Sequence, residues 1–195
     1  LIQVGSDKLL FDAGRGAVHQ RYRAGVEIGE IGPVFITHHH FDHINDLFDV
    51  IISSALNGRQ KELQIYGPSG TREIVKALLE QVYARDIRFR IEEGREFKRR
   101  GGNWDERPEA IPTVATSDVG PGLAAQGRHW KVFADHVLHG RFPAAPDFQW
   151  HCLGYRIEAQ GRVVAISGDA VMSEALVGLA RNADLLVQCC HLPYR

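Results

Sequence analysis

The stretch Thr37-His-His-His-Phe-Asp-His43 places four of the chain's ten histidines and one carboxylate in positions 38–43. Imidazole nitrogen and carboxylate oxygen are ligands that zinc and similar divalent metals accept. The stretch follows an apolar, strand-like run over residues 32–37, and open α/β sheets bind their ligands just past the carboxyl ends of strands. The pattern therefore predicts a metal site, and a polar turn with incidental histidines is the alternative interpretation.

The pattern Thr-His-x-His-x-Asp-His resembles the signature of the metallo-β-lactamase superfamily. The resemblance implies that His38 and His40 ligate a first metal, and that Asp42 and His43 ligate a second. His39 occupies the variable position, so it is expected to point outward or to support a ligand rather than bind metal.

Composition narrows the class of protein. At 195 residues and 44% apolar content, the chain is expected to form a single domain, residues 1–195, with a substantial core. The net charge of −1 and a pI near 6.9 give no global basic field to recruit nucleic acid. No apolar run approaches the roughly 18 residues of a membrane span. Cys152 and the adjacent Cys189 and Cys190 show no disulfide spacing, which favours a reduced, cytoplasmic setting, with the adjacent pair buried in a strand.

The first half of the chain predicts alternating strands and helices. We expect a hairpin from two strands, then a third strand, a helix, a fourth strand and a second helix that Thr71 caps. These lie at residues 1–4, 8–11, 33–37, 43–56, 63–66 and 72–84. Residues 85–107 carry eight basic and six acidic side chains, which predicts a solvated surface. The basic end at 95–100 is the minor alternative, an anion-binding patch.

The second half repeats the alternation. Strands are expected at 130–134, 153–158, 162–166 and 184–190, with a helix over 174–181 that Ser173 caps. This organisation suggests layered sheets covered by helices. The resemblance implies a four-layer αβ/βα metallo-β-lactamase sandwich.

Further ligands are expected at other strand ends. Asp169 resembles the aspartate that bridges both metals in the family, and a bridging carboxylate partly neutralises two nearby cations. A helix cap is its alternative role. For the third histidine of the first metal we favour His136, which follows a strand, with His139 and His151 as rivals. His139 could instead support a ligand or contact substrate.

Two expectations concern residues at the margins of the site. Asp12 belongs to an Asp-x-Gly element, and we expect it to orient ligand histidines by hydrogen bonds rather than bind metal.

The resemblance implies one further histidine for the second metal, carried by a helix–strand unit that this sequence lacks, with His191 as the less favoured substitute. We therefore expect the sequence to be truncated at both ends, since it opens on Leu1 rather than methionine.

The branch of the superfamily is indicated by weaker elements. Residues 11–16, 66–68 and 154–156, with the first loop, resemble the ribonuclease Z and arylsulfatase-like branch. Ribonuclease Z carries a long arm that grips tRNA between the Gly-Tyr stretch and the Gly-Asp motif. Only the twelve residues 157–168 lie there in this chain, and they predict a tight hairpin. We therefore predict that tRNA 3′-processing is disfavoured.

The resemblance implies metal-assisted hydrolysis with a hydroxide bridging two divalent ions. Zinc is expected, with manganese or iron as alternatives. Asp42 and His43 are the expected catalytic residues, with Asp42 orienting the nucleophile. We expect a small-molecule substrate, a phosphodiester, a sulfate ester or another ester, and neither nucleic acid nor a membrane as a partner. A homodimer is left open. A mononuclear iron oxygenase of the same fold and a non-catalytic metal-binding domain are the alternative functions.

Overall fold

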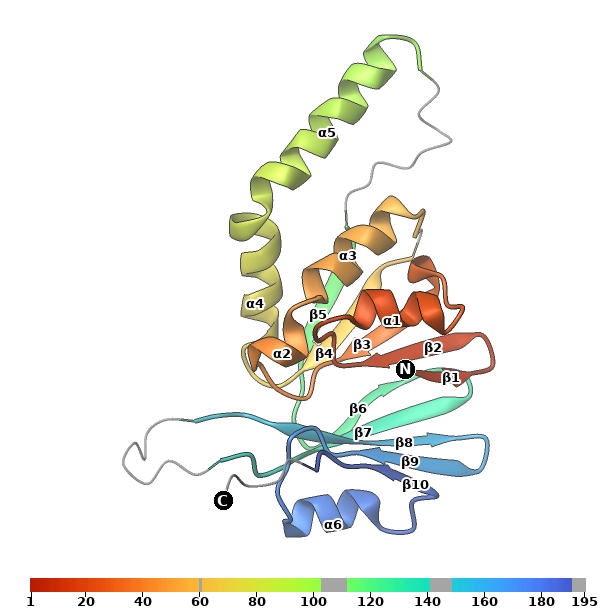
Figure 1. The fold of residues 1–195 in the computed structure, drawn as a ribbon, viewed down its shortest axis with the longest axis vertical. Coiled ribbons are helices and arrows are strands. Elements are labelled where there is room, and N and C mark those ends of the chain that lie inside the picture. The colour runs from red at the N-terminus through yellow and green to blue at the C-terminus, as the bar shows by residue number, and fades with distance from the viewer. Residues whose placement is uncertain (60, 103–111, 141–148, 191–195) are drawn as a thin grey trace.

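Two five-stranded sheets pack face to face in this computed structural model, and helices cover their outer faces (Figure 1). The structure describes residues 1–59, 61–102, 112–140 and 149–190. Helices α1 and α3 lie over the first sheet, and α6 lies over the second (Figure 1). The predicted four-layer αβ/βα sandwich is confirmed.

The first sheet has the strand order β1-β2-β3-β4-β5. Its strands are β1 (Ile2–Val4), β2 (Asp7–Phe11), β3 (Ile31–Phe35), β4 (Leu63–Gly67) and β5 (Val114–Asp118). The hairpin of β1 and β2 is antiparallel, and every later pair in this sheet is parallel. The carboxyl ends of β2, β3 and β4 therefore meet at one edge, where the chain leaves the sheet into the histidine-rich loop.

The second sheet has the order β10-β9-β8-β7-β6. Its strands are β6 (Gly122–Gln126), β7 (Trp130–His136), β8 (Leu153–Ala159), β9 (Arg162–Ile166) and β10 (Leu185–Val187). Only β9 and β10 pair in parallel. The predicted hairpin at 153–166 is confirmed as β8 and β9, whereas β5 and β6 were not predicted.

Side-chain alternation along the strands builds the central layers. On β2, Leu9 packs between the sheets and Leu10 packs under the helices, and Phe35 and Val34 divide in the same way on β3. This period of two is what a strand buried on both faces requires. Tyr155 ties the sheets together, because its hydroxyl donates to the carbonyl of Ile36 at 2.7 Å inside the core.

The predicted helix over 43–56 is divided in two. The structure has α2 (Phe41–Ile44) and α3 (Leu47–Leu56). The backbone of the loop after β2 causes the break, because the Ala13 carbonyl accepts from the Asp46 amide at 2.8 Å and the Ala13 amide donates to the His43 carbonyl at 2.9 Å. This pairing holds the metal-loop backbone against the end of β2.

The predicted helix over 72–84 is also changed. It becomes α4 (Thr71–Ala77) followed by a π-helical turn, η2 (Leu78–Val82), and a further helix, α5 (Ala84–Arg99). The expected cap was wrong: the Thr71 hydroxyl donates to the Pro68 carbonyl, and the Asp118 carboxylate accepts from the amides of Gly70 and Arg72. Figure 1 shows α5 projecting away from the sheets, and its one buried residue is Gly94. The expected solvated surface is this helix over residues 85–99, and residues 103–107 of that expectation lie outside the described residues.

The remaining helices are α1 (Ala17–Arg23), α6 (Glu174–Ala180) and the 3-10 turn η1 (Ile28–Glu30). The predicted Ser173 cap is confirmed, because its hydroxyl oxygen accepts from the Leu176 amide. The strand expected at 184–190 stops at Val187, so the expected burial of Cys189 and Cys190 was wrong and both thiols are exposed. Within the described ranges, the helices are too short or too polar to cross a membrane.

Candidate metal centre

The loop after β3 is anchored by the Asp12 carboxylate. Its Oδ1 accepts from the Thr37 amide at 2.7 Å, and its Oδ2 accepts from the Thr37 hydroxyl at 2.9 Å and lies 2.8 Å from His43 Nδ1. Asp12 has a φ of 56°, a left-handed conformation in which Asp is one of the better tolerated residues. One side chain at the end of β2 therefore orients both ends of the histidine-rich loop.

These contacts fix the ring tautomers of two histidines. Since the Thr37 hydroxyl donates to Asp12, its oxygen accepts a hydrogen from His38 Nδ1, 3.0 Å away. His43 donates from Nδ1 to Asp12 in the same manner. The Nε2 atom of each ring then carries the lone pair and faces the other ligand atoms, which is how metal-binding histidines are commonly oriented.

Two groups of ligand atoms gather at this edge of the sheets. Among the residues that the structure describes, the first group is His38, His40 and His139, and the second is His38, His43 and Asp169, with the atoms of each group within 4.8 Å of one another. His40 Nδ1 lies 2.9 Å from His38 Nε2 and 3.1 Å from His139 Nε2. Tetrahedral zinc with bonds of about 2.05 Å spaces its nitrogens by about 3.3 Å, so these two spacings are close to those of a zinc site.

The second group adds a carboxylate. Asp169 Oδ1 lies 3.4 Å from His43 Nε2. Its loop packs tightly against the first loop: Gly168 has a φ of 57°, and a Cβ there would lie 2.9 Å from Thr37 Cβ. Gly168 thus permits the close approach that brings Asp169 to the histidines. We expected Asp169 at this place from its strand end.

His136, the favoured third histidine, lies outside both groups. Strand β7 continues through His136, which is still paired with Leu153, so its exposed side chain remains at the sheet. The chain leaves the sheet over residues 137–140 and brings His139 to His40 instead. His151, the other rival, lies beside His136 with ring centroids 6.2 Å apart. The geometry therefore brings His139, and not His136, to the other histidines.

Two other predicted residues lie at the margin. Asp42 Oδ2 is 4.0 Å from His43 Nε2, and the Asp42 side chain is 57% exposed, so this expected ligand stands outside both groups. His39 hydrogen-bonds to the Thr71 hydroxyl at 2.8 Å and belongs to neither group. His191, the less favoured last ligand, lies outside the described residues.

Burial sets the protonation of the ring nitrogens. His38 is 1% exposed, and burial, followed by the charges of neighbouring histidines, lowers its pKa to about 3. Burial also lowers the pKa of His139. For His43 the hydrogen bond to Asp12 dominates and raises the pKa. Metal binding requires neutral imidazole, so His38 and His139 are ready to bind at neutral pH.

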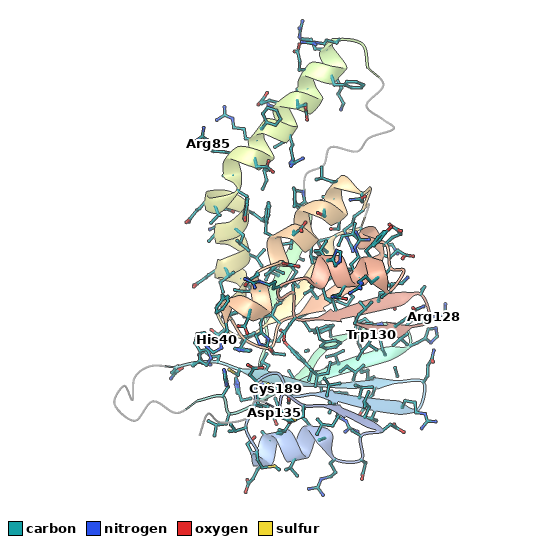
Figure 2. All side chains as sticks on the ribbon, viewed as in Figure 1. His40, Arg85, Arg128, Trp130, Asp135 and Cys189 are labelled. Atoms are coloured by element: carbon teal, nitrogen blue, oxygen red, sulfur yellow. The ribbon has the colours of Figure 1, made fainter. Side chains whose placement is uncertain are left out.

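Trp150 is a neighbour of the site that was not predicted from the sequence. Its ring lies 4.7 Å from the His40 ring, at an interplanar angle of 34°, and it also packs against the cluster of Val137, Cys152 and α6. No spacing rule in the sequence could have found it. Figure 2 shows His40 at the end of the sheets near α2, with Arg128 at the far end of the second sheet.

Comparison with known proteins gives consistent matches. The family model described as "Beta-lactamase superfamily domain" matches residues 7–191. Ribonuclease Z of Mycobacterium bovis (strain BCG / Pasteur 1173P2) is 32% identical over 191 residues, which are 96% of this chain and 61% of that protein. The chain thus spans less than two thirds of the length of this relative.

Solved structures share the fold. Human tRNase Z, short form, superposes with a TM-score of 0.64 at 20% identity, covering 95% of this chain and 67% of that one. A diphosphatase from the PhnP family gives a TM-score of 0.64 at 18% identity, covering 94% and 56%. At these identities the likeness shows the fold alone.

The relatives contradict two expectations from the sequence. We disfavoured tRNA processing and expected a small-molecule ester substrate without nucleic acid, yet the similar proteins are named ribonuclease Z. Those expectations were wrong because overall charge and the length of one hairpin bear on how RNA is captured, whereas the ligand groups determine the reaction.

Proposed function

This chain belongs to the metallo-β-lactamase superfamily and resembles its ribonuclease Z branch, and from that premise we propose that it is a metal-dependent hydrolase that cuts phosphodiester bonds in RNA. The substrate we propose is the 3′ end of precursor tRNA. The observation that carries the proposal is the pair of ligand groups sharing His38, at the edge where both sheets end.

We assign the ligands from the free lone pairs. His38 has a single nitrogen available, because its Nδ1 faces Thr37, so it serves one ion together with His40 and His139. We assign His43 and Asp169 to the second ion. We add Asp42, which lies outside both groups, as a further ligand of that ion. A nitrogen-rich set with carboxylates suits zinc first, and manganese and iron also accept it. Divalent ions bound there supply an activated water and stabilise negative charge on the phosphate.

The protein's own groups position that chemistry. Asp12 holds His43, and through Thr37 it holds His38, so both rings keep their Nε2 lone pairs toward the site. The Asp169 carboxylate would balance positive charge held at the second group. To Asp42, whose side chain is more than half exposed, we assign the role of orienting a water and accepting its proton.

The proposal is tested by incubating protein purified without chelator with a precursor tRNA carrying a 3′ trailer. We expect a cut at the trailer junction, which chelation abolishes and divalent metal restores. His38→Ala should remove the activity. Trailer removal that is unaffected by chelator or by His38→Ala would sink the proposal.

The ligand set has its own test in a matched pair of variants. We expect His139→Ala to weaken metal binding by at least about 100-fold, since even groups that only hydrogen-bond to ligands are worth about 10–100-fold. His136→Ala, three residues earlier and outside both groups, should bind metal like the parent protein. Isothermal titration with zinc distinguishes them, and the reverse order would restore His136 as the ligand.

A further inference from the structure

Phe41 is an exposed aromatic residue inside the candidate metal loop. It stands between His40 and Asp42, and its side chain is 72% exposed. Single exposed apolar residues are common on protein surfaces, so exposure alone is weak evidence for a functional role. The position is more informative, because each neighbour in sequence belongs to the proposed metal centre or its margin.

The backbone beneath Phe41 is held in place. Phe41 is the first residue of α2, and the His43 amide closes that turn on the His40 carbonyl at 3.0 Å. Gly14 packs so closely below that a Cβ there would lie 1.9 Å from the Asp42 carbonyl oxygen. The ring is thus carried on a supported backbone, which reduces the entropy lost when a ligand binds against it.

Within the part of the chain that the structure describes, no packing partner accounts for the Phe41 ring. Among the described residues, no aromatic ring contact involves Phe41, whereas the His40 ring packs against Trp150. Phe41 also contributes to none of the three buried apolar clusters of the described chain. A planar apolar face is therefore presented to solvent beside the centre.

We propose that Phe41 stacks on a nucleobase that flanks the scissile phosphodiester. This inference rests on the proposed function. Phe41 lies between His40 and Asp42 at the start of α2, with its Cα about 3.8 Å from each of theirs, so we place a base next to the bound phosphate within reach of its exposed ring. Bases of single-stranded RNA stack on aromatic side chains, and alanine substitution costs about 1–3 kcal/mol for each base. A phosphate group alone would gain nothing from an aromatic face, so this ring selects for a substrate that carries a base.

The test combines variants with modified RNA. We expect Phe41→Ala to lower kcat/KM for a precursor tRNA by about 5- to 150-fold, the equivalent of that stacking energy. Phe41→Leu keeps an apolar side chain without a π-face and should show a similar loss, whereas Phe41→Tyr should retain most of the activity. Tyr22→Ala, which removes an aromatic residue that is 71% exposed on α1, is the control and should cleave normally.

The modified RNA identifies the contact. Precursor tRNAs that are abasic at the nucleotide before or after the scissile bond are cleaved by each variant. With one of them, the loss caused by Phe41→Leu should shrink to about twofold, because the stacking partner is already absent. An undiminished loss on both abasic RNAs, or parent-like cleavage of intact RNA by Phe41→Leu, would overturn the inference.

This design distinguishes failure of the proposed function from failure of the stacking role alone. If the parent protein with bound metal does not cut precursor tRNA, the proposed function itself fails. If the parent cuts but Phe41→Leu behaves like the parent, only the stacking role fails. Elemental analysis of each variant checks its metal content, and the comparison is made between proteins with equal metal.

Discussion

Asp12 shows how much of the site depends on a single side chain that is not itself in either ligand group. Its carboxylate holds the Thr37 amide, the Thr37 hydroxyl and His43 Nδ1. From the sequence, an Asp-x-Gly turn predicted an orienting residue, and the structure places its contacts on both ends of the loop. The sequence could not show which atoms it would meet, because its partners lie 25 and 31 residues away along the chain.

Asp12→Asn is the mildest test of this role. Asn keeps the shape and tolerates the left-handed backbone at φ 56°, but it removes the charge and one acceptor. We expect zinc affinity to fall about 10–100-fold with the fold retained. Titration of zinc into the metal-free protein measures this. Asp86→Asn, which removes a carboxylate paired with Arg90 on α5, is the control, and an equal loss there would contradict a specific role.

Cys152 provides a prediction about the reactivity of a buried thiol. Burial is the main cause that raises its thiol pKa to about 12, from an ordinary value of 9.0. At pH 8 only about one such thiol in ten thousand is ionised, and the thiolate is the reactive form. We expect a thiol reagent to label two cysteines of the native protein, the exposed Cys189 and Cys190, and a third only after unfolding.

The raised pKa of Cys152 also makes the stability of the protein depend on pH. The folded state favours the neutral thiol of Cys152, so this contribution is fully present below about pH 9 and is lost as the pH rises from 9 to about 12. Rapid labelling of three thiols in the native protein at pH 8 would contradict the burial of Cys152.

Among the elements, the short helix α2 and the loop after β2 form the least replaceable contact. Gly14 lies against the backbone of α2, where a Cβ would meet the Asp42 carbonyl at 1.9 Å. Sequence periodicity predicted one helix over 43–56, and it failed here because the bonds that divide the helix come from residue 13, far from the periodic pattern. The strands β2, β3, β8 and β9 were predicted well, since each is an apolar run bounded by turn residues.

Gly14→Ala is expected to displace α2 and lower the free energy of unfolding by about 1–3 kcal/mol, the usual effect of an overpacked contact. Zinc affinity should fall with it, because α2 carries His43. Chemical denaturation followed by circular dichroism measures the stability.

Gly178→Ala is the matched control, since it lies in α6 with nothing within 4 Å of the added Cβ. It should stabilise the protein by about 0.5–1 kcal/mol. Equal stabilities for the two variants would mean that α2 tolerates movement at this contact.

For the whole molecule, three apolar clusters fill the spaces between the four layers, one under α1 and α3, one between the sheets and one under α6. We propose on this basis that residues 1–195 form one folding unit, so that near- and far-ultraviolet circular dichroism should report coincident unfolding transitions. Transitions at separate denaturant concentrations would contradict it.

At this scale the sequence predicted the layered fold through its family resemblance and the first loop. The sequence favoured His136 over His139, whereas the structure brings His139 to His38 and His40, because which histidine reaches them depends on where β7 leaves the sheet. The prediction about the substrate failed at the same scale. Net charge describes the whole surface, whereas the ligand groups lie at only one edge of the sheets.

The most direct test of the account is a titration of metal-free protein with zinc or manganese in which bound metal and precursor tRNA cleavage are measured together. We predict that cleavage at the 3′ trailer appears as the chain approaches two bound ions, and that His139→Ala requires far more metal to reach the same rate. Saturation with metal that produces no cleavage of precursor tRNA would contradict the proposed function.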